Sequence, residues 1–179
     1  MWSEGNFEQA RHHFLLSKDG PSCGHFLIQL SLLKGFTNET DLFVAQIVLQ
    51  QLSLKEKKAA LETFETYTKY HPKVATTEPP FFTPLLNFIF FLLKIIDIGK
   101  LSMFTSLCCL YEKTLKRDSS YDNYLKKIGV LFFGVPPQQQ PSSGGIFGDF
   151  LNQLFQDLDE DTPRVSNATN QSSEQNELD

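Results

Sequence analysis

The hydrophobic pattern of the chain centres on one almost uninterrupted apolar segment, residues 84–98. Within PLLNFIFFLLKIIDI only Asn87, Lys94 and Asp97 are polar, so a helix formed here is apolar almost all round and has to be covered by neighbours. Fifteen helical residues are about 22 Å long, which is less than the roughly 30 Å of hydrocarbon in a bilayer. We therefore predict a buried scaffold helix and not a membrane span.

The ends of this central helix are marked by local signals. Thr83 is placed to be the N-cap, Pro84 suits the first turn, and Gly99 follows the last apolar residue. On a helical wheel the residues expected in the core are Phe88, Ile89, Leu92, Leu93 and Ile96. The least buried edge holds the three polar residues together with Phe90, Phe91 and Ile98.

Apolar residues recur at steps of three and four in most of the remaining chain. This spacing predicts six further helices, which run over about 7–17, 23–34, 38–52, 53–70, 101–115 and 121–132. No stretch alternates with period two for long enough to predict a sheet. Short connections imply antiparallel neighbours. The predicted fold class is therefore all-α, an open antiparallel helical-hairpin solenoid.

Turn and capping chemistry predicts where several helices start. Gly5-Asn6-Phe7 looks like a turn and N-cap that follows the end of an earlier helix, Asn38 can cap a third helix, and Ser53 with Glu56 forms a possible capping box. We also expect the helix over 7–17 to leave part of its apolar face exposed.

A weak repeat points to tetratricopeptide-like hairpins. Ala10 and Phe14 return as Ala60 and Phe64, each pair followed by a proline, and Ala-x3-Phe lets a partner helix approach while the aromatic ring fills the gap. The same spacing also occurs in ordinary amphipathic helices. The repeat alone does not distinguish tetratricopeptide-like hairpins from ordinary amphipathic helices.

The charge distribution divides the chain. Residues 1–134 hold 15 Lys/Arg and 13 Asp/Glu, a balance of +2, whereas residues 135–179 hold 1 and 8, a balance of −7. We predict a helical domain over 1–134, a Pro/Gln/Gly/Ser linker over 135–145, and a flexible, disordered acidic tail over 159–179. The domain has no basic footprint, so nucleic acid is not an expected partner.

One short segment of the tail differs from its surroundings. Residues 146–158 place seven apolar side chains on one helical face, namely Ile146, Phe147, Phe150, Leu151, Leu154, Phe155 and Leu158. Their polar face is acidic, which disfavours anionic lipid, so direct membrane insertion is not expected. Docking back on the solenoid and binding in a partner's groove both remain open.

Candidate chemistry is sparse, and we expect no catalysis, cofactor or metal. His12 and His13 are adjacent on a predicted helix and point about 100° apart, so they cannot share a metal ion. Cys23 with His25 lacks a second ligand pair. The pair Cys108-Cys109 is interpreted as packing.

Cellular location is predicted from cysteine usage and from the start of the chain. Three cysteines without framework spacing suit a reducing compartment. The N-terminus shows no secretory signal. We expect a cytosolic protein.

Several segments carry a resemblance to a known family. They are EGNFEQARHHFLLSKDG, DLFVAQIVLQQLSLKEK, PPFFTPLLNFIFFLLKIIDIGKLSMFTSLC, YLKKIGVLFFGVPP and the terminal ELD. In order and spacing they resemble the C-terminal part of the Golgi-to-ER traffic protein 4 family, the scaffold subunit of the transmembrane-domain recognition complex. The resemblance covers residues 1 to about 137 and is looser in the tail.

The resemblance implies a function. Members of the family are helical solenoids that act as non-catalytic adaptors in the delivery of tail-anchored membrane proteins to the endoplasmic reticulum. They link a targeting ATPase to a pre-targeting complex with a ubiquitin-like protein and, in animals, a Bag-family scaffold. In the family the helices before Trp2 engage the ATPase, so we expect this chain, as a fragment, short isoform or partial gene product, to keep the partner-holding half. Without the resemblance, a lipid-binding or hydrophobic-ligand protein is the alternative.

The partner-binding hypothesis rests on aromatic residues left over at the edge and ends of helices. The residues concerned are Phe81, Phe82, Phe90, Phe91, Ile98, Phe132 and Phe133. Interface energy concentrates in a few aromatic anchors, so this set can hold the pre-targeting partner. Ordinary solenoid packing is the competing interpretation.

Overall fold

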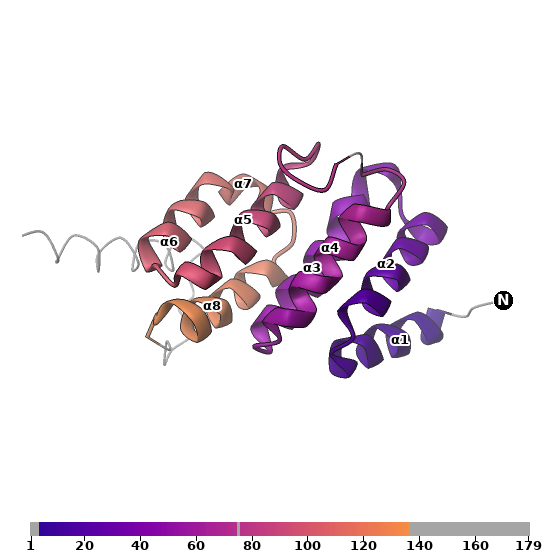
Figure 1. Ribbon diagram of the computed structural model, residues 1–179, viewed down its shortest axis with the longest axis horizontal. Coiled ribbons are helices and arrows are strands. Elements are labelled where there is room, and N and C mark those ends of the chain that lie inside the picture. The colour runs from indigo at the N-terminus through magenta and orange to yellow at the C-terminus, as the bar shows by residue number, and fades with distance from the viewer. Residues whose placement is uncertain (1–3, 75, 137–179) are drawn as a thin grey trace, which may run out of the picture.

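The computed structural model describes residues 4–74 and 76–136, with no side-chain description for 4–8 and 37, and within these ranges every regular element is helical. The elements in chain order are α1 (Glu4–Ser17), α2 (Gly20–Lys34), η1 (Thr37–Glu39), α3 (Thr40–Ser53), α4 (Lys57–Tyr70), α5 (Pro84–Ile98), α6 (Leu101–Leu110), α7 (Glu112–Leu115) and α8 (Ser120–Phe133). α1 and α2 lie at one end of the stack, α3 and α4 in the middle, and α5 to α8 at the other end (Figure 1). The all-α solenoid prediction is confirmed.

The central helix has the predicted bounds. α5 begins at Pro84 and ends before Gly99, which adopts a left-handed conformation with φ of 68°. The five residues predicted for its core are all buried, namely Phe88, Ile89, Leu92, Leu93 and Ile96. α5 contacts α3, α4, α6 and α7, which is why a helix apolar on nearly every side is stable here.

The closest helix pair is α2 with α4. Gly20 and Gly24 on α2 face α4, and a Cβ on Gly20 would lie 2.6 Å from the carbonyl oxygen of Ala59. A Cβ on Gly24 would lie 2.7 Å from the Cβ of Thr66. The two glycines therefore set the distance between these helices.

Aromatic rings join the later helices. The rings of Phe104 on α6 and Phe133 on α8 stack with centroids 4.4 Å apart. Phe88 on α5 packs against Tyr111, between α6 and α7, at 5.7 Å. Large apolar areas are buried by such contacts, and each fully buried Leu or Phe stabilises the fold by about 1.5–3 kcal/mol.

Three predicted helix starts were wrong. α1 runs through Gly5-Asn6-Phe7 from Glu4, so the glycine's penalty of about 1 kcal/mol in a helix does not break it. Asn38 lies inside η1 and does not cap α3. The hydroxyl of Ser53, the last residue of α3, donates to the carbonyl of Gln50 at 2.8 Å, so it cannot cap α4.

Two further boundaries differ from the prediction. α2 begins three residues early, at Gly20, because the Asp19 carboxylate accepts from the backbone N–H of Ser22 at 3.0 Å. The helix predicted over 101–115 is divided into α6 and α7 at Tyr111. The described residues therefore hold eight α-helices where seven helices were predicted.

Among the described residues, no helix combines the length and hydropathy needed to cross a bilayer. The predicted linker beyond residue 136, the amphipathic segment 146–158 and the acidic tail lie outside the described residues.

Candidate partner-binding surface

A half-open groove lies between α4 and α5. It has a volume of about 380 Å³. Its floor and walls are formed by Leu61, Phe64, Glu65, Thr68, Lys69, Thr77, Glu78, Phe90, Leu93 and Lys94. The ammonium group of Lys94 lies 5.3 Å from the centre of the Phe90 ring, within cation–π range. The groove thus has an apolar floor with charges of both signs at its rim.

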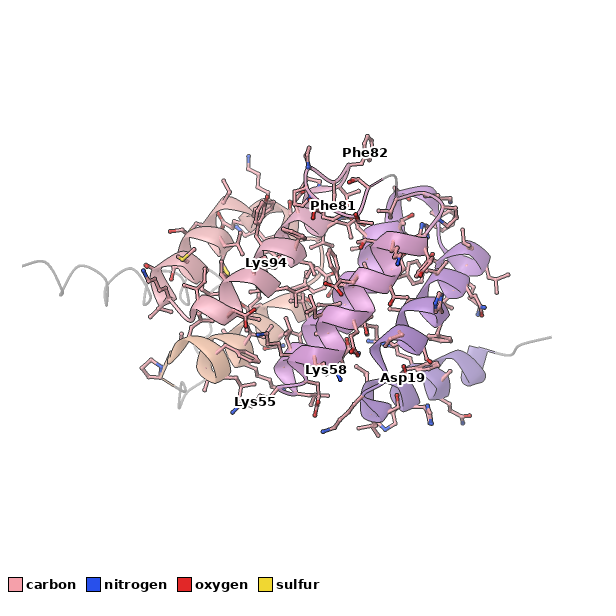
Figure 2. All side chains as sticks on the ribbon, viewed as in Figure 1. Asp19, Lys55, Lys58, Phe81, Phe82 and Lys94 are labelled. Carbon is pink, nitrogen blue, oxygen red and sulfur yellow. The ribbon has the colours of Figure 1, made fainter. Side chains whose placement is uncertain are left out.

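A second hollow of about 470 Å³ lies where the loop before α5 meets the start of α3. Its lining residues are Thr40, Asp41, Lys73, Val74, Thr76, Pro80, Phe81, Phe82, Thr83 and Leu86. Phe82 is fully exposed, and Figure 2 shows it projecting from the edge of the molecule near Phe81. We call the groove and this hollow together the α4–α5 surface.

Asn87 fixes the loop that carries Phe81 and Phe82. Its Oδ1 accepts from the Phe81 N–H at 2.8 Å, and its Nδ2 donates to the carbonyls of Phe81 at 3.0 Å and Thr83 at 3.2 Å. Phe81 is thereby turned inward, where its ring meets Phe64 at 5.8 Å. Phe82 is left facing solvent.

The role of Asn87 was missed from sequence, where it was interpreted as part of the least buried edge of the helix. The available signal was a single amide in an otherwise apolar stretch, one turn after Pro84. Asn side chains commonly bond nearby backbone groups at such positions.

The seven predicted partner-binding residues separate into exposed, half-buried and buried groups. Phe82, Phe91 and Ile98 are exposed, and Phe90 and Phe132 are half-buried. The expectation of incomplete burial was wrong for Phe81 and Phe133. Phe81 is drawn in by Asn87 and Phe64, and Phe133 is covered because it stacks on Phe104.

The structure brings part of this set together. Phe90 lies between Phe81 and Phe91, with ring centroids 6.1 and 5.6 Å apart. A Cβ on Gly99 would lie 3.8 Å from the Phe132 carbonyl, which places Phe132 beside the C-terminal end of α5 and not at the groove. The aromatic anchors of the α4–α5 surface are therefore Phe82, Phe90 and Phe91.

The three cysteine thiols have raised pKa values. Burial raises the pKa of the Cys23 thiol to about 11, and burial also raises the pKa of Cys108 and of Cys109. Thiols with raised pKa values are poor nucleophiles at neutral pH. Within residues 4–74 and 76–136 no three His, Cys, Asp or Glu side chains form a group that could hold a metal ion.

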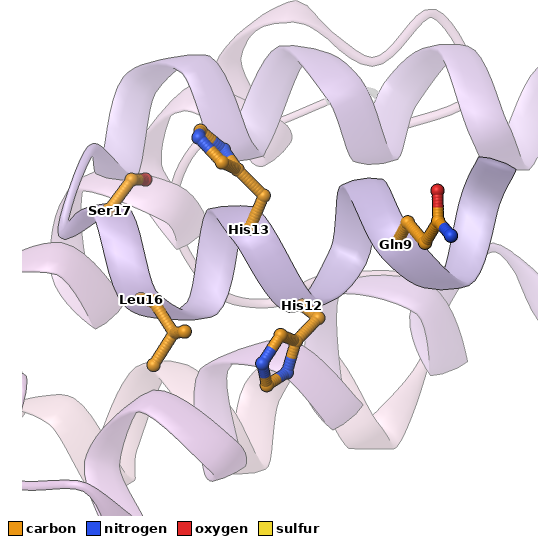
Figure 3. A pocket seen from close by; sticks show the side chains of 5 residues that line it. All are labelled: Gln9, His12, His13, Leu16 and Ser17. Atoms are coloured by element: carbon orange, nitrogen blue, oxygen red, sulfur yellow. The ribbon is translucent and has the colours of Figure 1, made fainter.

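A third hollow, of about 710 Å³, lies along a single helix, α1. Its lining residues are Gln9, His12, His13, Leu16 and Ser17. Figure 3 shows His12 and His13 pointing to different sides of the helix. In residues 9–17 the exposed large apolar side chain is Leu16, while Phe14 and Leu15 pack on the core. The exposed apolar patch expected over residues 7–17 stays a prediction, because the side chain of Phe7 lies outside the described residues.

The fold and this surface define an α-helical solenoid with an aromatic, partly open face. Residues 1–155 match the model of the family described as Golgi to ER traffic protein 4. The chain belongs to the Golgi to ER traffic protein 4 family.

Individual relatives agree with this assignment. The chain is 52% identical over 155 residues to the Golgi to ER traffic protein 4 homolog of Oryzias latipes, and 50% identical over 155 residues to that of Homo sapiens. Each match covers 87% of this chain, with 48% and 47% of the respective relative. The chain therefore spans about half the length of these relatives.

A solved structure has the same fold. The crystal structure of C. therm. Get4 superposes with a TM-score of 0.66 at 23% identity, covering 85% of this chain and 52% of that one. At this identity the likeness concerns the fold alone.

Proposed function

We propose that this chain is a non-catalytic adaptor that holds partner proteins during the delivery of tail-anchored membrane proteins to the endoplasmic reticulum. The partners are the ubiquitin-like protein and the Bag-family scaffold of the pre-targeting complex. Membership in a Golgi to ER traffic family supports a role in this transport step. We infer that contact with the targeting ATPase belongs to the part of the relatives that this chain does not span.

The observation that carries the proposal is the aromatic content of the α4–α5 surface. Phe82 is fully exposed and lines the second hollow. Phe91 is 39% exposed, and its ring contacts Phe90, which lines the groove. Aromatic anchors next to a groove are the usual centre of binding energy in a protein interface. The mixed charges at the rim, Lys69 and Lys94 with Glu65 and Glu78, suit the polar rim of such an interface.

Further support comes from the thiols and the interior. Cys23, Cys108 and Cys109 are free, which suits action in the reducing cytosol. The interior phenylalanines, such as Phe64 and Phe104, pack against other rings. This packing of rings in the described interior favours the adaptor over a carrier of lipid.

The test is capture of the purified ubiquitin-like and Bag-family partners by the full chain. Phe82→Ser combined with Phe91→Ser should weaken capture at least tenfold and leave the far-ultraviolet circular dichroism helical, since both side chains face solvent. The control is Leu16→Ser, because Leu16 is 62% exposed but lies on α1, at the end of the stack (Figure 1). This control should bind as the wild type does.

Two results would reject the proposal. One is a double variant that captures both partners as well as the wild type. The other is a wild-type chain that ignores these partners and binds the targeting ATPase directly. Lipid that copurifies with the chain and is displaced by neither partner would favour the carrier function instead.

A further inference from the structure

The chain leaves the described structure beside α6 and α8. After α8 it turns at Gly134, which has a φ of 72°. The N–H of Val135 then donates to the carbonyl of Gly129 at 3.2 Å. A Cβ on Gly129 would lie 3.1 Å from Val135 and 3.4 Å from Phe104 of α6. The residues that follow therefore start next to the contact between α6 and α8.

α6 carries an apolar flank that the described residues leave open. Met103, Leu107 and Leu110 follow one another at steps of four and three, so they lie on one side of the helix. Met103 is 38% exposed, Leu107 is half-buried and Leu110 is 77% exposed. α6 lies at the opposite end of the stack from α1 (Figure 1). We call these three residues the α6 flank.

The end of a solenoid ordinarily needs a cap. Each unit of a helical stack buries its apolar faces against its neighbours, so the last unit has one face without a neighbour. The α6 flank is such a face within the described residues. A capping element should bring apolar groups inward and polar groups outward.

Charge at this end complements the remainder of the chain. Residues 100–134 hold six Lys/Arg and three Asp/Glu, a balance of +3, whereas residues 137–179 hold one and eight, a balance of −7. Lys100, at the start of α6, and Lys113, beyond its end, are both exposed. Opposite charges of this kind draw two segments together and fix which face meets which.

The length of the chain suits a cap formed by residues 146–158. Its seven apolar residues share one face, and Asp149 and Asp157 lie on the other. Residues 137–145 form a nine-residue tether, which spans at most about 32 Å. A helix over 146–158 would be about 20 Å long and α6 is about 15 Å long, so the segment can reach and cover the whole flank. The match to the family model runs to residue 155, beyond the tether and into this segment.

We propose that residues 146–158 fold back as an amphipathic helix on the α6 flank of the same chain and cap the C-terminal end of the solenoid. This intramolecular contact is separate from the α4–α5 surface and does not depend on the proposed adaptor function.

The test is hydrogen–deuterium exchange of the full chain, measured by mass spectrometry at a concentration where light scattering shows a monomer. Amides of residues 146–158 should exchange at least tenfold more slowly than their intrinsic rates. Leu110→Asp should return them to near-intrinsic exchange while α3 and α5 stay protected. The matched control is Leu33→Asp on α2, because Leu33 is 73% exposed and lies on an element at the other end of the stack.

Substitutions within residues 146–158 test the same contact. Leu154→Asp should speed exchange in α6, whereas Gln153→Asp, on the polar face of the segment, should not. Because residue 154 lies in the tail and Leu110 faces solvent, neither variant disturbs the core, and circular dichroism checks that the helices remain.

Three outcomes would overturn the proposal. The first is intrinsic exchange over 146–158 in the wild type. The second is protection that Leu110→Asp leaves unchanged, which would place the segment elsewhere. The third is protection that rises with protein concentration, which would place the segment on a second copy.

Discussion

The guanidinium of Arg117 donates to the buried carboxylate of Asp41, with Nη1 2.7 Å from Oδ2. Asp41 is in the first turn of α3, and Arg117 lies between α7 and α8, 76 residues further along the chain. Arg117 Nη2 also donates to the Asn38 carbonyl at 3.3 Å. This contact ties the last part of the solenoid to its middle.

Removing Arg117 should therefore be costly. The Asp41 side chain is 1% exposed, and Arg117→Ala removes its charged partner. A buried charge that loses its partner costs up to 3–5 kcal/mol, and partial exposure of Arg117 reduces this to about 2–3 kcal/mol. Urea unfolding measures the loss. As a control, Lys116→Ala breaks an exposed pair with Glu112 and should cost less than about 0.5 kcal/mol.

The distance between α2 and α4 gives a second prediction. In Gly24→Ala the added methyl group would meet Thr66 at 2.7 Å and the Thr63 carbonyl at 3.0 Å. Overpacking of this kind costs about 1–3 kcal/mol, so the melting temperature should fall by several degrees. Gln29→Ala, at an exposed position of the same helix, should melt like the wild type. An unchanged melt for Gly24→Ala would mean that the helices are less tightly packed.

Stability should depend on pH through His71. The backbone N–H of Lys73 donates to His71 Nδ1 at 3.1 Å, so the ring proton is on Nε2, which donates to the Ser31 hydroxyl at 2.7 Å. The Ser31 hydroxyl in turn donates to the Ile28 carbonyl at 3.0 Å. Burial, with a smaller effect from Lys73, lowers the pKa of His71 below its usual 6.5. The folded protein therefore holds a neutral imidazole.

The sign of the effect follows from proton linkage. Below pH 6.5 the unfolded chain binds a proton at this histidine before the folded protein does. The His71 contribution is complete above pH 6.5 and is lost as pH falls from 6.5 towards the lowered folded pKa. His71→Gln should flatten the change in unfolding free energy between pH 7.5 and 5.5. His25→Gln, at an exposed site, should keep the wild-type slope.

The core position of Leu92 provides a fourth prediction. Leu92 is completely buried in α5, and an unpaired carboxylate there loses its hydration without compensation. Leu92→Asp should unfold the domain, seen as loss of the cooperative thermal transition. Ile98→Asp, on the same helix but 52% exposed, should retain a cooperative melt. A normal melt for Leu92→Asp would contradict the packing of the central helix.

Local chemistry in the sequence was enough to predict the central helix. Pro84 fixes a conformation suited to a first turn, and Gly99 accepts the left-handed backbone that ends a helix, so both boundaries are properties of the residues beside them. The buried residues of α5 also followed from periodicity, because a segment this apolar has few ways to place its polar edge.

Capping at other helices was less predictable. Asn38 and Ser53 are good capping residues in isolation. In the structure Asn38 lies inside η1, and the Ser53 hydroxyl donates to a carbonyl in the last turn of α3. The choice among several locally acceptable caps depends on where the neighbouring helices require each helix to begin.

The α4–α5 surface could be predicted only in part from the sequence. The sequence by itself determined that the chain forms a helical stack and that the region of Phe81 to Phe91 carries surplus aromatic residues. Only the tertiary structure decided that Phe81 is buried while Phe82 is exposed. The two are identical side chains with adjacent positions, and their fates depend on hydrogen bonds from Asn87 and on contact with Phe64, 17 residues earlier. Such contacts join distant parts of the chain, and no local pattern encodes which partner will be within reach.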